Sequence, residues 1–378
     1  MNSKVLVFCP YYPPHIGGLE SHADEFNKYL VKNGFEITVF TPRLPKEAIK
    51  KEIRYSKVKI IRYPAWEIIP NYPLPCFWKK EYWNLKNELS SQKYNWVISR
   101  TRFFMTSVMA GIWAKKNKIK WLHIEHGSDF VKLNSQFKSF IAKSFDYTFG
   151  RWILKRADKI VANSLASAEF CKKIFPKRKY EVIYRGIEIN GVKDNLKLKK
   201  EYKDKIKIAY TGRLIDGKGV RDLVEAVSKL LNDNWVLFIV GDGPRKKDLK
   251  DYVASLGLKS KIIFLGQLER LDSIGVINIS DIVVNPSYTE GLPTSIIEAA
   301  KCGKAIVATD VGGTREIIDD GKSGVLIPVK DIEIMKDKIE ILINNKKLRE
   351  QLGDEAKKKV NDSFDWKASI KKYINILE

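Results

Sequence analysis

The sequence lacks any long hydrophobic run. Nowhere in its 378 residues does an apolar stretch approach the roughly 20 residues that a helix needs to cross a bilayer. The apolar residues 4–9 are followed at once by Pro10 and are too short for a signal peptide, so they predict a first β-strand. We therefore expect neither a transmembrane helix nor a secretion signal.

Cysteine is scarce, and the chain lacks the Asp-x-Asp pair of carboxylates that commonly binds a metal ion. The cysteines are far apart, and no spacing typical of metal ligands joins Cys9, Cys76, Cys171 and Cys302. Reduced, mostly buried thiols are typical of cytosolic proteins, so we expect a cytoplasmic location. No Asp-x-Asp pair occurs either, so the chain lacks the usual carboxylate clamp for a metal-bridged diphosphate.

Acidic residues are scarce in the first half only. Residues 1–200 carry 38 basic and 17 acidic side chains, a net charge of +21, whereas residues 201–378 carry 30 and 28, a net charge of +2. A general bias in composition would affect both halves, so the asymmetry needs another cause. A basic N-terminal half favours an anionic partner, which could be a membrane surface, a phosphorylated lipid acceptor or nucleic acid.

Apolar strand patterns alternate with helical patterns in both halves. Strands are expected at residues 4–9, 36–40, 96–99, 121–124, 158–162, 206–211, 235–240, 262–265, 281–284 and 305–309, and helices at 19–32 and 220–231, with Ser164 as a helix cap. Such alternation predicts parallel sheets with right-handed crossovers, and the chain is long enough for two α/β domains. Residues 193–205 are charged and lack an apolar face, which predicts an interdomain linker.

The most informative motif is the segment from Glu290 to Glu298. It places one carboxylate in a Gly/Pro loop after an expected strand and the other in the first turn of the following helix. Carboxylates in such positions can accept paired hydrogen bonds from sugar hydroxyls. Arg213 and Lys218 supply two cations in an earlier strand-to-helix loop. Since ligands of open α/β sheets bind beyond the carboxyl ends of strands, the motif predicts a sugar-nucleotide site.

Each of these residues also has a simpler interpretation. Ser295 and Glu298 fit a capping box, in which the glutamate closes back on the backbone N–H of the serine. Glu290 fits a solvated loop residue, and the two cations fit exposed surface charges of little energetic value. These interpretations explain the residues one by one but not their joint placement at the ends of successive strands, so we favour the sugar-nucleotide site.

With these motifs the chain resembles the retaining family 4 glycosyltransferases of GT-B fold. The resemblance covers nearly the whole chain and rests on an ordered set of segments, at residues 10–20, 125–127, 157–164, 212–219, 241–244, 290–298 and 311–316. It implies two Rossmann-like doubly wound domains that face each other across a cleft, with a C-terminal helix that crosses back to the first. The expected domains are residues 1–192 with 364–378 on the acceptor side, the linker 193–205, and residues 206–363, which bind the nucleotide sugar.

The resemblance also assigns roles. Arg213 and Lys218 contact the donor diphosphate, Glu290 holds hydroxyls of the transferred sugar, and Glu298 accepts from the ribose hydroxyls. His126 is the active-site histidine that contacts the donor sugar. Further donor contacts are expected from backbone groups, namely those of Gly17, Gly18, Gly291, Leu292 and Thr294, and Gly266 and Gln267 are candidates for contact with the base. Where many relatives have an Asn-Gly pair, this chain has Arg185, which fits either a phosphate contact or a solvent-facing side chain.

The expected activity is that of a retaining hexosyltransferase. It would move a sugar from a UDP-, GDP- or ADP-sugar to a glycan or lipid-linked acceptor, without a cofactor and without a metal ion, because Arg213 and Lys218 replace the metal. Alternatives are a GT-B sugar phosphorylase or epimerase, or a non-catalytic protein that binds sugar nucleotides or nucleic acid. We do not expect nucleic acid as the partner.

Two basic segments rich in aromatic residues bear on the acceptor side. They are residues 72–83 and the helical stripe over residues 137–153. A basic amphipathic helix can lie on an anionic membrane, whereas an apolar stripe more commonly faces the core of its own domain. Both interpretations stay open here, and the first adds the inner face of the cytoplasmic membrane to the expected location.

Overall fold

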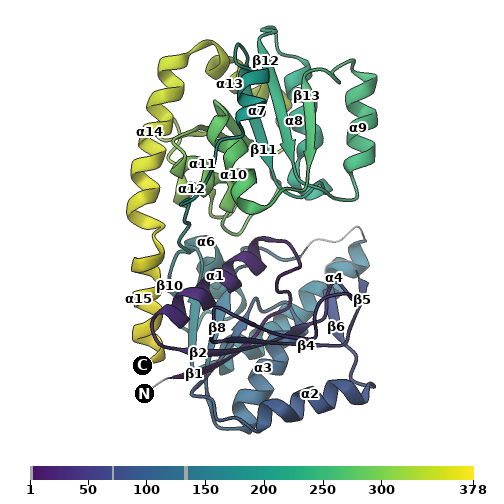
Figure 1. Ribbon diagram of the computed structural model, residues 1–378, viewed down its shortest axis with the longest axis vertical. Coiled ribbons are helices and arrows are strands. Elements are labelled where there is room, and N and C mark those ends of the chain that lie inside the picture. The colour runs from purple at the N-terminus through teal and green to yellow at the C-terminus, as the bar shows by residue number, and fades with distance from the viewer. Residues whose placement is uncertain (1–2, 70–71, 132–134) are drawn as a thin grey trace. The chain divides into compact units, whose positions relative to one another are not determined.

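The computed structural model describes residues 3–69, 72–131 and 135–378. The chain divides into two compact units, Met1–Arg185 with Trp366–Glu378, and Gly186–Asp365. Each unit is an α/β layer structure with its own sheet and hydrophobic core (Figure 1). The predicted fold class, two Rossmann-like units with a C-terminal helix that returns to the first, is confirmed.

The first unit is built on an eight-stranded sheet of order β10-β9-β8-β7-β1-β2-β4-β3, which is parallel except for β3. Its strands are β1 (Lys4–Phe8), β2 (Glu36–Pro42), β3 (Lys51–Arg54), β4 (Val58–Tyr63), β7 (Trp96–Arg100), β8 (Lys120–Glu125), β9 (Lys159–Ala162) and β10 (Glu181–Val182), with a separate hairpin of β5 (Ala65–Ile69) and β6 (Tyr72–Pro75). Its helices are α1 (Gly18–Lys32), α2 (Lys80–Ser90), α3 (Met105–Lys116), α4 (Gln136–Phe145), the π-helix η1 (Asp146–Gly150), α5 (Arg151–Arg156), α6 (Leu165–Ile174) and α15 (Trp366–Leu377).

The second unit has a six-stranded parallel sheet of order β13-β12-β11-β14-β15-β16. Its strands are β11 (Ile206–Thr211), β12 (Trp235–Val240), β13 (Ile262–Gly266), β14 (Ile282–Asn285), β15 (Ala305–Thr309) and β16 (Val325–Ile327). Its helices are α7 (Leu196–Glu201), the 3₁₀ turn η2 (Asp216–Lys218), α8 (Val220–Ser228), α9 (Lys246–Ser255), α10 (Arg270–Ile279), α11 (Thr294–Lys301), α12 (Thr314–Ile317), α13 (Ile332–Asn344) and α14 (Lys346–Ser363).

Both faces of the first sheet are buried, which explains its nearly continuous apolar strands. Along β1, Leu6 and Phe8 belong to one core cluster, while Val5 and Val7 belong to the cluster on the other face. This is the pattern expected of a parallel sheet covered by helices on both sides. The strands are therefore mostly apolar, and polar side chains such as Glu125 and Asn163 stand at or just after their carboxyl ends.

The closing helix α15 packs on α1, and the two lie side by side in Figure 1. Trp366 at its start is 1% exposed and stacks on Tyr29 of α1, with ring centroids 5.2 Å apart. Its indole N–H donates to Glu25 over 3.1 Å. These contacts tie the C-terminal residues to the first unit, as the resemblance implied.

Residues 193–205 differ from the expected linker, because they lie within the second unit. They form α7, which Asn195 caps by accepting the backbone N–H of Leu198. Leu198 is buried in a cluster with Val236, Phe238 and Val276. Tyr202 packs against the same cluster, with its ring 5.4 Å from that of Phe238. These two residues attach the charged segment to the sheet, and they were too few for an apolar face to be recognised from the sequence. The division between the units comes earlier, after Arg185.

Candidate active site

The loops after β11 and β14 meet at one edge of the second sheet. The two strands are parallel neighbours, so their carboxyl ends lie together. Lys218 Nζ lies 2.6 Å from Glu290 Oε1, and Ser287 Oγ donates to the same oxygen over 2.7 Å. The backbone N–H of Tyr288 donates to Gly217 O over 2.9 Å. A cation and a carboxylate that are 72 positions apart in the sequence are thus held in direct contact.

The close approach of these loops depends on Gly219. Its φ of 61° is in the left-handed region, and a Cβ there would lie 2.1 Å from Pro286 O. A residue with a side chain would therefore push the two loops apart and separate Lys218 from Glu290. A second contact of this kind holds the start of α11, because Gly313 N donates to Gly291 O over 3.0 Å and a Cβ at Gly313 would lie 2.6 Å from that oxygen.

Glu298 pairs with a residue that the sequence did not suggest. Arg270 Nε lies 3.0 Å from Glu298 Oε1, and Arg270 also donates to Glu188 O over 3.3 Å. The helix α11 begins at Thr294 with Pro293 as its N-cap residue, so Ser295 lies inside the helix. The capping-box interpretation of Ser295 is therefore wrong. Glu298 lies beyond the first turn of α11, not within it as expected.

The remaining donor candidates of this unit line the same edge. Gly212 N donates to Val240 O over 3.0 Å and Gly241 N donates to Gly266 O over 2.8 Å, which joins the ends of β11, β12 and β13. Arg213 follows Gly212 directly, and its carbonyl accepts from Tyr210 over 3.0 Å. Gln267 is exposed beyond β13, and Gly291, Leu292 and Thr294 lie at the start of α11. The expected diphosphate, sugar and base residues thus belong to one continuous series of strand ends.

In the first unit, His126 follows β8 and lies beside a fully buried arginine. Arg100 Nη1 donates to His22 Nδ1 over 2.7 Å, and His22 Nδ1 lies 3.4 Å from His126 Nε2. Burial, with the Arg100 charge next in size, lowers the pKa of His126 to about 3. Burial and the Arg100 charge also hold the pKa of His22 well below its usual range. Both rings are therefore neutral near pH 7 and can act as hydrogen-bond partners rather than as acids.

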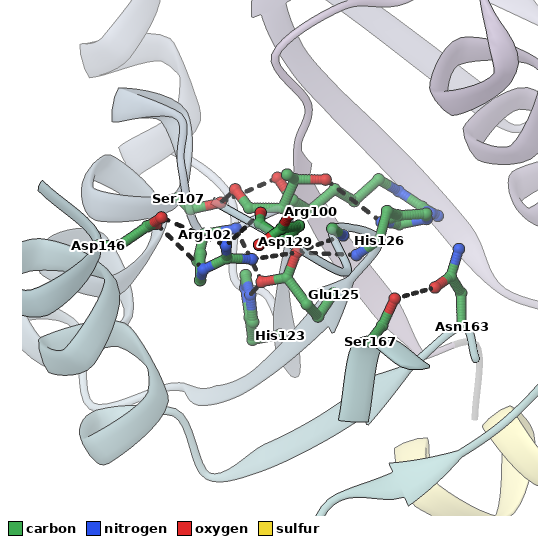
Figure 2. A network of polar contacts seen from close by, with 12 residues as sticks. Arg100, Arg102, Ser107, His123, Glu125, His126, Asp129, Asp146, Asn163 and Ser167 are labelled. Atoms are coloured by element: carbon green, nitrogen blue, oxygen red, sulfur yellow. Dashed lines mark hydrogen bonds and ion pairs between the residues drawn. The ribbon is translucent and has the colours of Figure 1, made fainter. Parts of the chain in front are cut away.

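A buried ion cluster lies on the other side of the His126 backbone (Figure 2). Arg102 Nη1 is 3.1 Å from Glu125 Oε1, and its Nε is 3.0 Å from Asp146 Oδ1. Glu125 Oε1 accepts the backbone N–H groups of His126, over 2.9 Å, and of Gly127, over 2.8 Å. Burial opposes the charge of Glu125, but Arg102, His123 and the Gly127 N–H outweigh it and hold its pKa below the usual range.

The glycine pair at the start of α1 is less open than the sequence suggested. Gly17 is the N-cap residue of α1, and a Cβ there would lie 2.4 Å from Glu20 Oε2, whereas nothing lies within 4 Å of a Cβ at Gly18. Arg185 is 4% exposed, pairs with Glu25 over 3.0 Å and donates to Gly18 O over 3.2 Å. It therefore does not face solvent, and it holds the first turn of α1.

Sequence reasoning missed Arg100, Arg102 and Asp146. A signal was available for the two arginines, because they follow the expected strand at residues 96–99 and so stand at a carboxyl end. Asp146 gave no such signal, since it lies in a π-helix within a helical stretch.

The aromatic stripe at residues 137–153 divides in two: Phe137, Phe140 and Ile141 are 71%, 68% and 52% exposed, whereas Ile153 is fully buried. The core-facing interpretation is thus wrong for these three residues of α4, whereas Phe145 at the end of α4 and Ile153 of α5 do pack in the core.

Other features of the described residues add little to the site. A pocket of about 230 Å³ lies beside α8 and α9, lined by residues that include Asp216, Arg245 and Tyr288, but not by Arg213, Lys218, Glu290 or Glu298. Within residues 3–69, 72–131 and 135–378, no three or more His, Cys, Asp or Glu side chains are grouped as a metal ion would need. Every helix in that part of the chain is too short or too polar to cross a membrane.

Comparison with known proteins gives the family. A family model described as Glycosyltransferase Family 4 matches residues 16–190, and one described as Glycosyl transferases group 1 matches residues 192–359. The uncharacterised glycosyltransferase MJ1069 of Methanocaldococcus jannaschii is 39% identical over 99% of this chain and 98% of its own length. N-acetyl-alpha-D-glucosaminyl L-malate synthase of Bacillus anthracis is 25% identical over 100% of this chain and 97% of its own.

Solved structures agree on the fold. Sucrose-phosphate synthase from Thermosynechococcus elongatus has a TM-score of 0.81 at 18% identity and covers 100% of this chain and 98% of its own. HepE of Anabaena, in complex with UDP and glucose, has a TM-score of 0.77 at 19% identity and covers 100% and 99%. Together with the family models and MJ1069, these matches lead to one conclusion: the chain belongs to the family 4 glycosyltransferases of GT-B fold.

Proposed function

We propose that this glycosyltransferase moves a sugar from a nucleotide-diphosphate sugar to a glycan or lipid-linked acceptor, with retention at the anomeric carbon and without a metal ion. The observation that carries the proposal is the contact between Lys218 and Glu290 at the edge of the second sheet. It joins a cation suited to a diphosphate to a carboxylate suited to sugar hydroxyls. A nucleotide sugar carries both groups next to each other, at the bond between the diphosphate and the sugar.

Each donor residue has a role that follows from charge. The bond between the anomeric carbon and the phosphate oxygen breaks, so negative charge grows on the departing diphosphate. Arg213 and Lys218 stabilise that charge more in the transition state than in the ground state. The backbone N–H groups of Leu292 and Thr294 add to this at the start of α11. Gly266 and Gln267, farther along the same edge, are assigned to the base.

We propose a front-face route for the transfer. The acceptor oxygen attacks the face from which the phosphate leaves, and the departing phosphate oxygen takes the acceptor proton, so the anomeric configuration is retained. A two-step route would need a carboxylate nucleophile on the opposite face, whereas Glu290 is engaged with Lys218 and Ser287. His126 is neutral near pH 7 because its pKa is lowered to about 3, so it acts as a hydrogen-bond partner of the sugar.

The donor is a UDP-, GDP- or ADP-sugar, and no cofactor is required. UDP is the first choice, because the HepE structures hold UDP, UDP with glucose, or UDP-glucose. Metal independence is proposed because Arg213 and Lys218 supply two cations to balance the charge of a diphosphate. If this is right, the turnover rate will be unchanged by excess EDTA, and a loss restored by Mg²⁺ would contradict it.

The test of the donor site is mutational. Glu290→Gln and Lys218→Ala should each lower turnover of the nucleotide sugar on the order of 100-fold or more, because each removes a charge that acts on the transition state. A thermal-shift screen of UDP-, GDP-, ADP- and CDP-sugars selects the donor, since a ligand stabilises in proportion to its affinity for the native state. NMR of the first product then reports the anomeric configuration.

A matched control is available in the same unit. Lys358 forms an exposed ion pair with Glu355 within α14, over 2.6 Å, so Lys358→Ala should leave turnover unchanged. Near-normal turnover in Glu290→Gln or Lys218→Ala would contradict the donor site. A protein that binds a sugar nucleotide but never cleaves it would favour a non-catalytic binding role. Phosphate-dependent cleavage would favour a phosphorylase, and a change of sugar configuration without transfer would favour an epimerase.

We also propose an anionic membrane surface as a partner, at the inner face of the cytoplasmic membrane. The support is the net charge of +21 over residues 1–200 and the exposed rings of Phe137, Phe140 and Trp78. Trp78 is 65% exposed. In co-sedimentation, the protein should bind liposomes with phosphatidylserine and not neutral ones, and Phe137→Ser with Phe140→Ser should weaken binding. Equal, negligible binding to both kinds of liposome would remove this partner.

A further inference from the structure

A fully buried ion cluster in the first unit has no part in the proposed chemistry. Arg102 lies between two carboxylates, 3.1 Å from Glu125 and 3.0 Å from Asp146, and the side chains of all three are at most 1% exposed. Taking such charges out of water is costly, and well-packed apolar residues of similar volume are often equally or more stabilising. Fold stability alone therefore does not account for three charged groups at this place.

The cluster is attached to the backbone of the His126 turn. Glu125 Oε1 accepts the N–H groups of both His126 and Gly127. Its other oxygen accepts the backbone N–H of Arg102 over 3.2 Å. One carboxylate thus joins the end of β8 to the second residue after β7. Gly127 is needed for this arrangement, because a Cβ there would lie 3.0 Å from Arg102 Nη1.

Arg102 is in turn fixed from two other elements (Figure 2). Asp146 comes from η1, and π-helical turns of this kind are frequent at functional sites. Phe170 of α6 lies under the guanidinium, 4.3 Å from ring centroid to Cζ. The guanidinium therefore has little freedom to turn, and neither has the carboxylate that it holds.

We propose that Arg102, Glu125 and Asp146 are positioning residues that fix the His126–Gly127 turn and so aim the His126 ring. The inference deepens the proposed function, because it rests on the role given there to His126. The carboxylate of Glu125 is the part that acts on the turn, Arg102 orients that carboxylate, and Asp146 orients Arg102. None of the three needs to touch a substrate.

The test removes the charges together, so that no buried ion is left unpaired. The full chain carries Arg102→Met, Glu125→Leu and Asp146→Leu, and its histidines are labelled with ¹⁵N. In the native protein His126 should stay neutral from pH 8 to pH 5, where it faces His22 of α1, Arg100 of β7 and Arg185. In the triple variant burial and Arg100 still keep the ring neutral, and the lost Glu125 charge had raised its pKa, so the readout is the ¹⁵N chemical shifts of His126 at pH 7. These shifts should change and the lines should broaden, because the ring is no longer held in one orientation. Turnover of UDP-glucose should fall on the order of 100-fold, with the KM changed less than about threefold.

Two further variants keep the result decisive. Glu125→Asp keeps the charge but is one methylene shorter, so it cannot reach Arg102 and both N–H groups at once, and it should show the same defects. Arg349→Met is the control, because Arg349 is a buried arginine of the second unit that donates to Leu342 O and Ile343 O. It should leave the His126 signal and turnover unchanged.

The proposal is overturned if the triple variant or Glu125→Asp folds and keeps both the native ¹⁵N shifts of His126 and native turnover. If the triple variant does not fold, Glu125→Asp decides alone. If the native protein does not cleave UDP-glucose, the choice of donor in the proposed function is in question, but the ¹⁵N shifts of His126 still decide whether these residues position the turn.

Discussion

Burial, together with the nearby charge of Arg100, determines the protonation of His126. Arg100 is fully buried, and among the described residues its Nε and Nη2 have no hydrogen-bond partner. Its Nη1 donates to His22, which therefore offers a lone pair at Nδ1 and carries its proton at Nε2. Burial, and after it the charge of the neighbouring guanidinium, keeps both imidazoles neutral. The site thus supplies a fixed cation and a neutral hydrogen-bonding ring at the end of neighbouring strands.

The low pKa of His126 predicts acid sensitivity of the fold. The folded pKa is about 3, below the ordinary value of 6.5, so below pH 6.5 the unfolded chain binds a proton that the folded chain does not. The free energy of unfolding should therefore fall with pH below 6.5, by up to about 1.4 kcal/mol per pH unit from this residue. Asp146, whose pKa burial raises to about 6, acts in the opposite direction between about pH 6 and pH 4.

Comparison of the native protein with His126→Gln isolates the histidine, because Asp146 contributes to both. Urea unfolding at pH 7, 6 and 5 should give a steeper loss of stability in the native protein than in the variant. The same pH dependence in the two proteins would show that His126 is not held neutral in the folded state.

At the scale of elements, the site depends on the ends of adjacent parallel strands. The turn from η2 into α8 lets the loop after β11 reach the loop after β14, and Gly219 makes this approach possible.

Gly219→Ala should therefore destabilise the second unit by about 1–3 kcal/mol, through the positive φ and the clash with Pro286 O. It should also reduce donor turnover, because Lys218 moves from Glu290. Gly321→Ala is the control: its φ of 71° carries similar strain, but nothing lies within 4 Å of its Cβ. Equal turnover in the two variants would contradict the role of this contact.

Strand ends were predictable from the sequence, and side-chain partners mostly were not. Buried parallel strands are continuous apolar runs, so β11, β12 and β15 have the predicted bounds, and Ser164 caps α6 as expected by accepting Ser167 N–H. Short or edge strands such as β3, β10 and β16 gave too little apolar signal. Two ion pairs, Arg270 with Glu298 and Arg102 with Asp146, show why. Each pair joins segments that are far apart in the sequence, and only the order of the strands in the sheet brings them together.

At the scale of the whole molecule, the chain forms two units with separate cores and returns to the first at its end. Leu214, Val224 and Ile239 belong to the core of the second unit, while Trp366 and Tyr373 of α15 belong to the core of the first. A chain built in this way should not unfold in one two-state transition. A nucleotide that binds only the second unit should raise the transition of that unit alone.

Trp366→Ala tests this division, because Trp366 is buried in the first unit next to the boundary at Asp365. The change removes its stacking on Tyr29 and its hydrogen bond to Glu25, and it should cost the first unit about 3–5 kcal/mol. In calorimetry one transition should fall, while the transition that UDP raises should stay in place. Trp78→Ala, at a largely exposed tryptophan, should shift neither by more than about 0.5 kcal/mol. If Trp366→Ala lowered both transitions equally, or if the native protein showed a single transition, the two cores would be folding as one cooperative structure.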